Sequence, residues 1–101
     1  MAADAALDGL DLVIHPIQRL RICTLLEPVT EEEFAVIRDL LGMSDSALSK
    51  QVSALADAGY VGQRRVVRAG KSRVRISLTD EGRAAFRRHL AALRALAGER
   101  R

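Results

Sequence analysis

The sequence predicts a mainly α-helical fold of the α+β class, with helices on either side of one β-hairpin. Apolar residues recur at helical spacing along residues 16–58 and again along residues 80–97, as they do in amphipathic helices. Residues 60–78 instead combine β-branched and basic residues, and part of this segment alternates strictly, which is typical of strands. A chain of 101 residues with 49% hydrophobic content is large enough for one core. We therefore expect a single domain over residues 1–101.

The N-terminal region is expected to form two helices separated at Pro16. Residues 4–14 have a helical pattern weakened by Gly9, and their acidic polar face suits a partner subunit or the C-terminal helix better than nucleic acid. Residues 16–26 begin at a proline, which favours a helix start, and their apolar side chains form a wide face for burial. Cys23 lies in this face. We interpret it as a packed small residue, because no second cysteine and no histidine spacing supports a metal site.

A further helix is expected over residues 30–42. Thr30 and Glu33 have the spacing of a capping box, in which each side chain accepts a free backbone N–H of the first turn. The acidic run from Glu31 to Glu33 would then lie at the positive end of the helix dipole, so we interpret it as a first-turn device and not as a catalytic cluster. Gly42 is expected to end the helix. The side chains expected in the core are Phe34, Ile37, Leu40 and Leu41.

The helix expected over residues 44–58 is distinguished by its polar face. A short turn containing Gly42 precedes it, as in a helix-turn-helix, and Ser44 is a suitable N-cap. Its narrow apolar stripe consists of Leu48, Val52 and Leu55. The opposite face consists of Ser46, Ser49, Lys50 and Ser53, with Gln51 on its flank. Hydroxyls, an amide and one lysine can approach phosphates and base edges, which indicates a DNA-recognition helix; an ordinary amphipathic surface helix is the alternative.

A basic hairpin is expected next. Residues 60–67 and 73–78 predict two strands, and the link over residues 68–72 contains the glycine that a hairpin turn favours. Residues 60–79 hold six basic residues and no acidic one. Such a hairpin can run beside a phosphate backbone or enter a minor groove. A solvated edge hairpin that uses arginine to block aggregation is the alternative.

Charge is divided unevenly along the chain. The net charge is only +3, yet residues 1–45 hold nine acidic and three basic residues, whereas residues 46–101 hold four acidic and thirteen basic ones. The basic half therefore begins at the expected recognition helix, so a charge boundary coincides with a structural signal.

The last helix is expected over residues 80–97, after a cap at Thr79. Its apolar stripe is Phe86, Leu90, Leu93 and Leu96. This stripe is longer than one small core readily covers, so we interpret it, with helix 4–14, as a dimer interface. His89 lies on its edge and is interpreted as a surface or interface histidine and not as a ligand.

These segments resemble the small single-domain winged-helix transcriptional regulators of the MarR and ArsR type. The similarity covers roughly residues 12–93 and rests on IHPIQRLRI, EEFAVIRDLLGMSDSALSKQVSALADAGYV and SLTDEGRAAFRRHLAAL. It implies a winged helix-turn-helix fold with a two-stranded basic wing over residues 64–75 and a C-terminal dimerisation helix. It also implies a cytoplasmic homodimer that binds double-stranded DNA through the recognition helix and acts as a repressor.

The resemblance implies site residues on two elements. The positions that fall where such proteins touch DNA are Ser44, Ser46, Ala47, Ser49, Lys50 and Gln51 on the helix, and Arg68, Lys71 and Arg73 on the wing. We expect Lys50 and Gln51 to read bases, and the serines and the wing residues to anchor phosphates. Gln51 stands where relatives often have histidine. The metal-sensing ArsR members have paired cysteines, which Cys23 alone does not supply, so no metal or cofactor is expected.

Other function classes find less support. No apolar run approaches the ~20 residues of a membrane span and no signal-peptide pattern opens the chain, which predicts a cytoplasmic protein. The sequence contains neither a glycine-rich phosphate loop nor a nucleophile with an evident base, so it gives no indication of an enzyme. The sequence names no small-molecule effector, and its few aromatic residues predict that any effector pocket between subunits is aliphatic. The remaining alternative is a winged-helix protein–protein interaction module without specific DNA binding, whose hairpin docks on an acidic partner.

Overall fold

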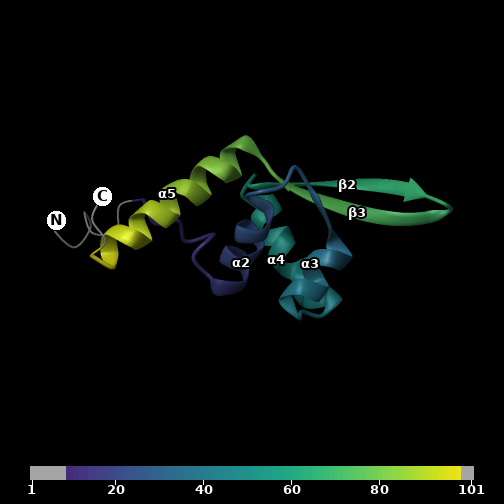
Figure 1. Cartoon of the computed structure of the whole chain (residues 1–101), viewed down its shortest axis with the longest axis horizontal. Helices are drawn as coiled ribbons and strands as arrows, with labels where there is room; N and C mark the ends of the chain where they lie inside the picture. The colour runs from purple at the N-terminus through teal and green to yellow at the C-terminus, as the bar shows by residue number, and fades with distance from the viewer. Residues whose placement is uncertain (1–8, 99–101) are drawn as a thin grey trace.

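The computed structural model describes residues 9–98 and has the predicted order of helices and hairpin from residue 16 onward. Its elements are α2 (Ile17–Leu26), β1 (Glu32–Glu33), α3 (Phe34–Leu41), α4 (Asp45–Asp57), β2 (Val61–Arg68), β3 (Lys71–Leu78) and α5 (Asp80–Leu96). The strands form an antiparallel sheet in the order β1-β3-β2. The β2–β3 hairpin and α5 extend in opposite directions from a body made of α2, α3 and α4 (Figure 1). This is the predicted α+β winged-helix arrangement.

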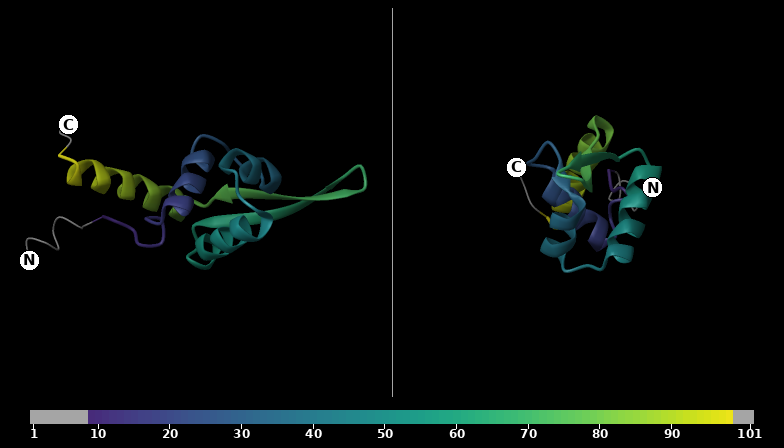
Figure 2. Two further views of the ribbon diagram at one scale, coloured as in Figure 1. Left: turned by 90° about the horizontal axis from the view of Figure 1, so that it is seen from below. Right: turned by 90° about the vertical axis from the view of Figure 1, so that its right-hand side faces the viewer.

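The core lies where α2 packs against α4 and α5, and where these helices meet the base of the hairpin (Figure 2). Its fully buried side chains include Ile14, Ile22, Cys23, Leu26, Ile37, Leu48, Leu55 and Ile76. Burial raises the pKa of the Cys23 thiol to about 12, so the thiol stays protonated and packs as a small apolar group. The predicted burial of Leu40 is wrong, because this side chain is 63% exposed at the C-terminal end of α3.

The helix predicted over residues 4–14 is not formed in its described part, and residues 4–8 lie outside the described residues. The Asp11 side chain accepts the backbone N–H groups of Val13 (2.9 Å) and Ile14 (3.3 Å), so it satisfies donors that a helix would pair with backbone carbonyls. Gly9 adopts a left-handed conformation with φ of +90°. The segment is therefore a series of turns that brings Ile14 into the core.

His89 is fully buried, so its predicted place at a surface or interface is wrong. Its Nδ1 atom accepts the backbone N–H of Asp11 at 2.9 Å, and the Asp11 carboxylate accepts the Tyr60 hydroxyl. Desolvation, reinforced by nearby His15, lowers the His89 pKa despite the opposing effect of Asp11. The neutral ring therefore links the N-terminal segment to α5, and Asp11 links both to the start of the hairpin.

The capping box predicted at Thr30 is also wrong, because α3 begins only at Phe34. Glu32 and Glu33 instead form β1 and pair with Ile76 and Arg75 of β3. Sheet pairing outcompetes the helical start, since it satisfies the backbone of this segment and places acidic side chains beside arginines of β3.

The start of α5 packs directly on the backbone of Tyr60. Thr79 caps the helix, because its hydroxyl oxygen accepts the N–H of Gly82 at 2.9 Å, and its hydroxyl donates to the Gly59 carbonyl at 2.7 Å. A Cβ at Gly82 would overlap the Tyr60 carbonyl oxygen and lie 2.8 Å from the Tyr60 Cα. This close approach requires glycine.

We expect Gly82→Ala to lower the free energy of unfolding by about 2 kcal/mol or more, as overpacking does, although alanine normally stabilises a helix relative to glycine. Chemical denaturation monitored by circular dichroism measures the change. Gly62→Ala is the matched control, because a Cβ there meets only Ser77 Oγ at 3.7 Å. Equal stabilities of the two variants would contradict the packing argument.

A second prediction concerns acid. Because the folded-state pKa of His89 lies below its unfolded value of about 6.5, its stabilisation is complete above that pH and is lost as pH falls through the folded-state pKa. The variant His89→Asn keeps an acceptor near the position of Nδ1 but does not titrate. Between pH 7.5 and pH 5 we expect the melting temperature of the wild type to fall more than that of His89→Asn. A difference that stays constant over this range would show that His89 does not contribute in this way.

Candidate nucleic-acid interface

The exposed face of α4 is held in place by its N-cap and its buried stripe. Ser44 caps the helix, because its Oγ accepts the N–H of Ala47 at 3.1 Å. Leu48, Val52 and Leu55 are buried as predicted. The exposed side chains along the middle of the solvent side are Ser46, Ser49, Lys50 and Ser53, and Asp45 and Asp57 are exposed at its two ends. No ion pair with the described residues engages Lys50, so its ammonium group is available to a ligand.

An arginine of α3 fixes the turn that leads into α4. Gly42 ends α3 in a left-handed conformation with φ of 65°, as predicted for a C-cap. Arg38 then pairs with Asp45 at 2.8 Å and with Asp39 at 2.9 Å, and these two carboxylates raise the Arg38 pKa. The pair with Asp45 ties the first residue of α4 to α3.

Gln51 lies on the flank of α4 that faces α2. Its Oε1 accepts the Nε–H of Arg19 at 3.0 Å, and the same guanidinium donates to the Val13 carbonyl at 3.0 Å. The amide is therefore oriented by Arg19, which leaves its Nε2 donors for other partners. The contribution of Arg19 was not predicted from the sequence. Arg19 and Gln51 are 32 residues apart, so no local sequence pattern indicates their contact.

The hairpin is paired to its tip. The connection between the strands is shorter than the predicted link over residues 68–72. It is the two-residue turn Ala69–Gly70, whose φ angles are 52° and 75°. Positive φ at both positions gives a type I′ turn, which matches the twist of the strands and lets the ladder continue. Arg68 and Lys71 are consequently opposite each other at the last rung.

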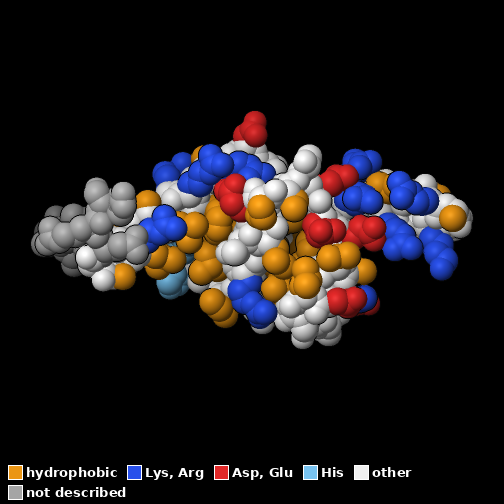
Figure 3. Space-filling model, viewed as in Figure 1, with side chains coloured by type: hydrophobic (Ala, Val, Ile, Leu, Met, Phe, Trp, Pro, Cys, Tyr) orange, Lys and Arg blue, Asp and Glu red, His pale blue; other side chains and the backbone are white. Residues whose placement is uncertain are grey.

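One face of the hairpin collects most of its positive charge. Directly opposed residues of an antiparallel ladder point to the same side, and the register opposes Arg64 to Arg75, Val66 to Arg73, and Arg68 to Lys71. We call this side the basic face; its charged members are Arg64, Arg68, Lys71, Arg73 and Arg75. Figure 3 shows lysine and arginine side chains gathered along the hairpin, with acidic side chains near its base.

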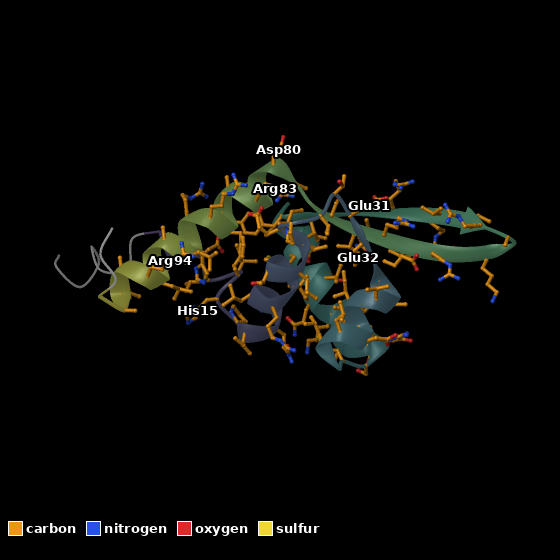
Figure 4. The ribbon with its side chains drawn as sticks, viewed as in Figure 1. His15, Glu31, Glu32, Asp80, Arg83 and Arg94 are labelled. Atoms are coloured by element: carbon orange, nitrogen blue, oxygen red, sulfur yellow. The ribbon has the colours of Figure 1, made fainter. Side chains whose placement is uncertain are left out.

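The acidic side chains at the base come from β1 and the residue before it (Figure 4). Glu31 pairs with Arg64 and lies 3.8 Å from Arg75, and Glu33 pairs with Arg73 at 3.1 Å and with Arg75 at 3.6 Å. The bond to Arg64 lowers the Glu31 pKa and raises that of Arg64. Although residues 60–79 contain no acidic residue, the base of the hairpin therefore has acidic partners from another part of the chain.

The predicted site residues thus fall into two groups with different surroundings. The residues of α4 share one exposed helix end and face, apart from half-buried Ala47 and Gln51. On the wing, Arg68 and Lys71 have no carboxylate partner among residues 9–98, whereas Arg73 is paired with Glu33. The residues that the sequence did not assign to this region are Glu31 and Glu33, which pair with wing arginines. They were predicted to lie in the first turn of a helix, because an acidic run also fits a helix start.

Two classes of site receive no support within residues 9–98. No helix in this range is both long and apolar enough to cross a membrane. The same range contains no group of three or more histidine, cysteine, aspartate and glutamate side chains that could hold a metal ion.

Comparisons with known proteins agree with this geometry. The family model described as "Winged helix DNA-binding domain" matches residues 18–97. An uncharacterized protein of Methanocaldococcus jannaschii is 26% identical over 78 residues, which cover 77% of this chain and 85% of that protein.

Solved structures show the same fold. A transcriptional regulator homologue from Pyrococcus horikoshii superposes with a TM-score of 0.82 at 23% identity, covering 95% of this chain and 93% of the other. The PcaV transcriptional regulator of Streptomyces coelicolor, solved in complex with its natural ligand, superposes with a TM-score of 0.74 at 20% identity, covering 95% of this chain and 67% of the other.

Proposed function

Because the chain belongs to the winged helix DNA-binding domain family, we propose that it is a homodimeric, sequence-specific transcriptional regulator. The observation that carries the proposal is the solvent face of α4, where exposed serines surround Lys50, which has no ion-pair partner within residues 9–98. A surface helix in water gains from oppositely charged neighbours one turn apart, whereas Lys50 has no carboxylate three or four residues away, and Asp45 and Asp57 lie at the two ends of α4. The middle of this face therefore suits contact with a polyanion. The family and the fold are those of a DNA-binding domain and not of an enzyme.

In the proposed complex, α4 enters the major groove and the hairpin lies on the flanking backbone. Lys50 and Gln51 read base edges, with Arg19 orienting the Gln51 amide so that it presents its N–H donors. The exposed serines of α4 and the wing residues Arg68, Lys71 and Arg73 bind phosphates.

Exposed apolar side chains support a dimer formed through the terminal segments. Along α5, Phe86 is buried whereas Leu96 is 47% exposed, and Leu12 of the N-terminal segment is 81% exposed. A second copy that covers these side chains would remove apolar area from water. A twofold dimer then reads a pseudo-palindrome with half-sites about one helical turn, ~10 bp, apart.

We further propose that occupation of a promoter represses it, because a bound dimer excludes polymerase from the same DNA. A small-molecule effector would meet mainly aliphatic side chains between the subunits, since aromatic residues make up 3% of the chain.

One observation favours a second candidate function. Glu31 and Glu33 neutralise part of the basic face, which lowers the attraction to DNA and suits a protein-interaction module whose hairpin tip docks on an acidic partner.

Selection from a random duplex library at two salt concentrations distinguishes the two. We expect the purified protein to enrich a two-fold symmetric site, with affinity that falls steeply as salt rises because phosphate contacts release counterions. Light scattering of the complex checks that two subunits bind one site. Weak binding without an enriched motif would favour the interaction module.

Substitutions test the assignment of base readers. Lys50→Ala and Gln51→Ala should each change the ranking of preferred sequences, since a good base contact discriminates by about 1–3 kcal/mol. Lys71→Ala should weaken all sequences alike and reduce the salt slope by about 1. Competition binding against a panel of single-base variants of the selected site measures both effects. If all three variants lowered affinity uniformly, Lys50 and Gln51 would not be base readers.

A further inference from the structure

The basic face of the hairpin contains a hollow lined mainly by arginines. Its volume is about 260 Å³, and it is lined by Glu33, Val66, Arg68, Arg73 and Arg75. Three guanidinium groups and one carboxylate thus share one concave site. Arginine suits such a site, because its planar fork of N–H donors matches the oxygens of carboxylates and phosphates.

Glu33 is the acidic side chain in this hollow. It lies 3.1 Å from Arg73 and 3.6 Å from Arg75, while Arg68 has no carboxylate within ion-pair distance among the described residues. Arg75 also faces Glu31, but at 3.8 Å. The lining therefore has more positive than negative charge even with Glu33 in place.

The ion pairs of Glu33 are open to exchange. The Arg73 side chain is 48% exposed, whereas Glu33 and Arg75 are 23% and 27% exposed, so both pairs are partly accessible to solvent. Solvent and salt weaken ion pairs at a protein surface. An incoming anion can therefore displace the carboxylate without opening the fold.

Arg68 and Lys71 add a further reason for an anion here. They are opposed at the last rung of the ladder, and like charges placed opposite each other destabilise a strand pair. A phosphate beside Arg68 would relieve this repulsion and could bond Arg73 at the same time.

We propose that this hollow is a binding subsite for a backbone phosphate of DNA and that Glu33 occupies it in the free protein as a built-in competitor. The inference rests on the proposed function. When DNA binds, the phosphate takes the place of the Glu33 carboxylate beside Arg73 and Arg75. Glu33 thereby lowers the affinity for DNA that lacks good base contacts, and the tip residues make the first backbone contacts.

Glu33→Gln tests the proposal, with Glu32→Gln as the matched control. Both variants remove one negative charge from β1, so both change the net charge equally. Glu32 is opposed to Ile76 on the other side of the sheet and forms no ion pair with the described residues. Its Oε1 accepts the Glu33 N–H at 2.9 Å, and glutamine keeps this acceptor.

The measurement is the affinity for a duplex of random sequence over a series of salt concentrations. We expect Glu33→Gln to bind more tightly than Glu32→Gln at each salt concentration, because the phosphate no longer has to displace a carboxylate. Equal affinities of the two variants would overturn the proposal. Weaker binding by Glu33→Gln would also overturn it, because Glu33 would then act by holding the hairpin in place.

Retention on heparin separates this inference from the proposed function. If the wild type bound no duplex DNA, the proposed function would fail. Heparin is a polyanion without a base sequence, so its binding would still show whether the hollow binds an anion. Later elution of Glu33→Gln than of Glu32→Gln supports an anion site masked by Glu33, and identical elution rejects it.

Discussion

The pairing of β1 with β3 is the constraint on which the candidate interface depends. The two residues of β1, Glu32 and Glu33, pair with β3. Because of this pairing α3 begins only at Phe34, and Glu31 and Glu33 lie at the base of the hairpin. These carboxylates neutralise the arginines nearest the body. The hairpin is thus anchored by charge at its base and open to an anion at its tip.

A second set of contacts ties α5 to the start of the same hairpin. The buried His89 ring accepts the Asp11 N–H, the Asp11 carboxylate accepts the Tyr60 hydroxyl, and the bond to Asp11, reinforced by desolvation, raises the Tyr60 pKa to about 12. On the other side of Tyr60, its backbone lies against Gly82. Tyr60 lies between the end of α4 and the start of β2, and it therefore links this junction to both the N-terminal segment and α5.

The electrostatics of the two predicted contact regions are different in kind. The α4 face is mostly uncharged and exposes Lys50 among serines, which suits discrimination between sequences. The wing holds its charge partly in internal pairs, so its contribution to nonspecific attraction is smaller than its six basic residues suggest. Under the proposed function the protein must reject a large excess of other DNA, and partial neutralisation of the wing would serve that requirement.

The sequence by itself determined the local structure: the cap at Ser44, the apolar stripe of α4, the strict alternation of β3 and the cap at Thr79 all depend on neighbours within a few residues. It also identified the exposed face of α4. Only the tertiary structure decided the roles of Glu33, Arg19 and His89, because their partners lie between 32 and 78 residues away. A carboxylate run has the same pattern whether it starts a helix or pairs with distant arginines, and only the packed chain brings those arginines within reach.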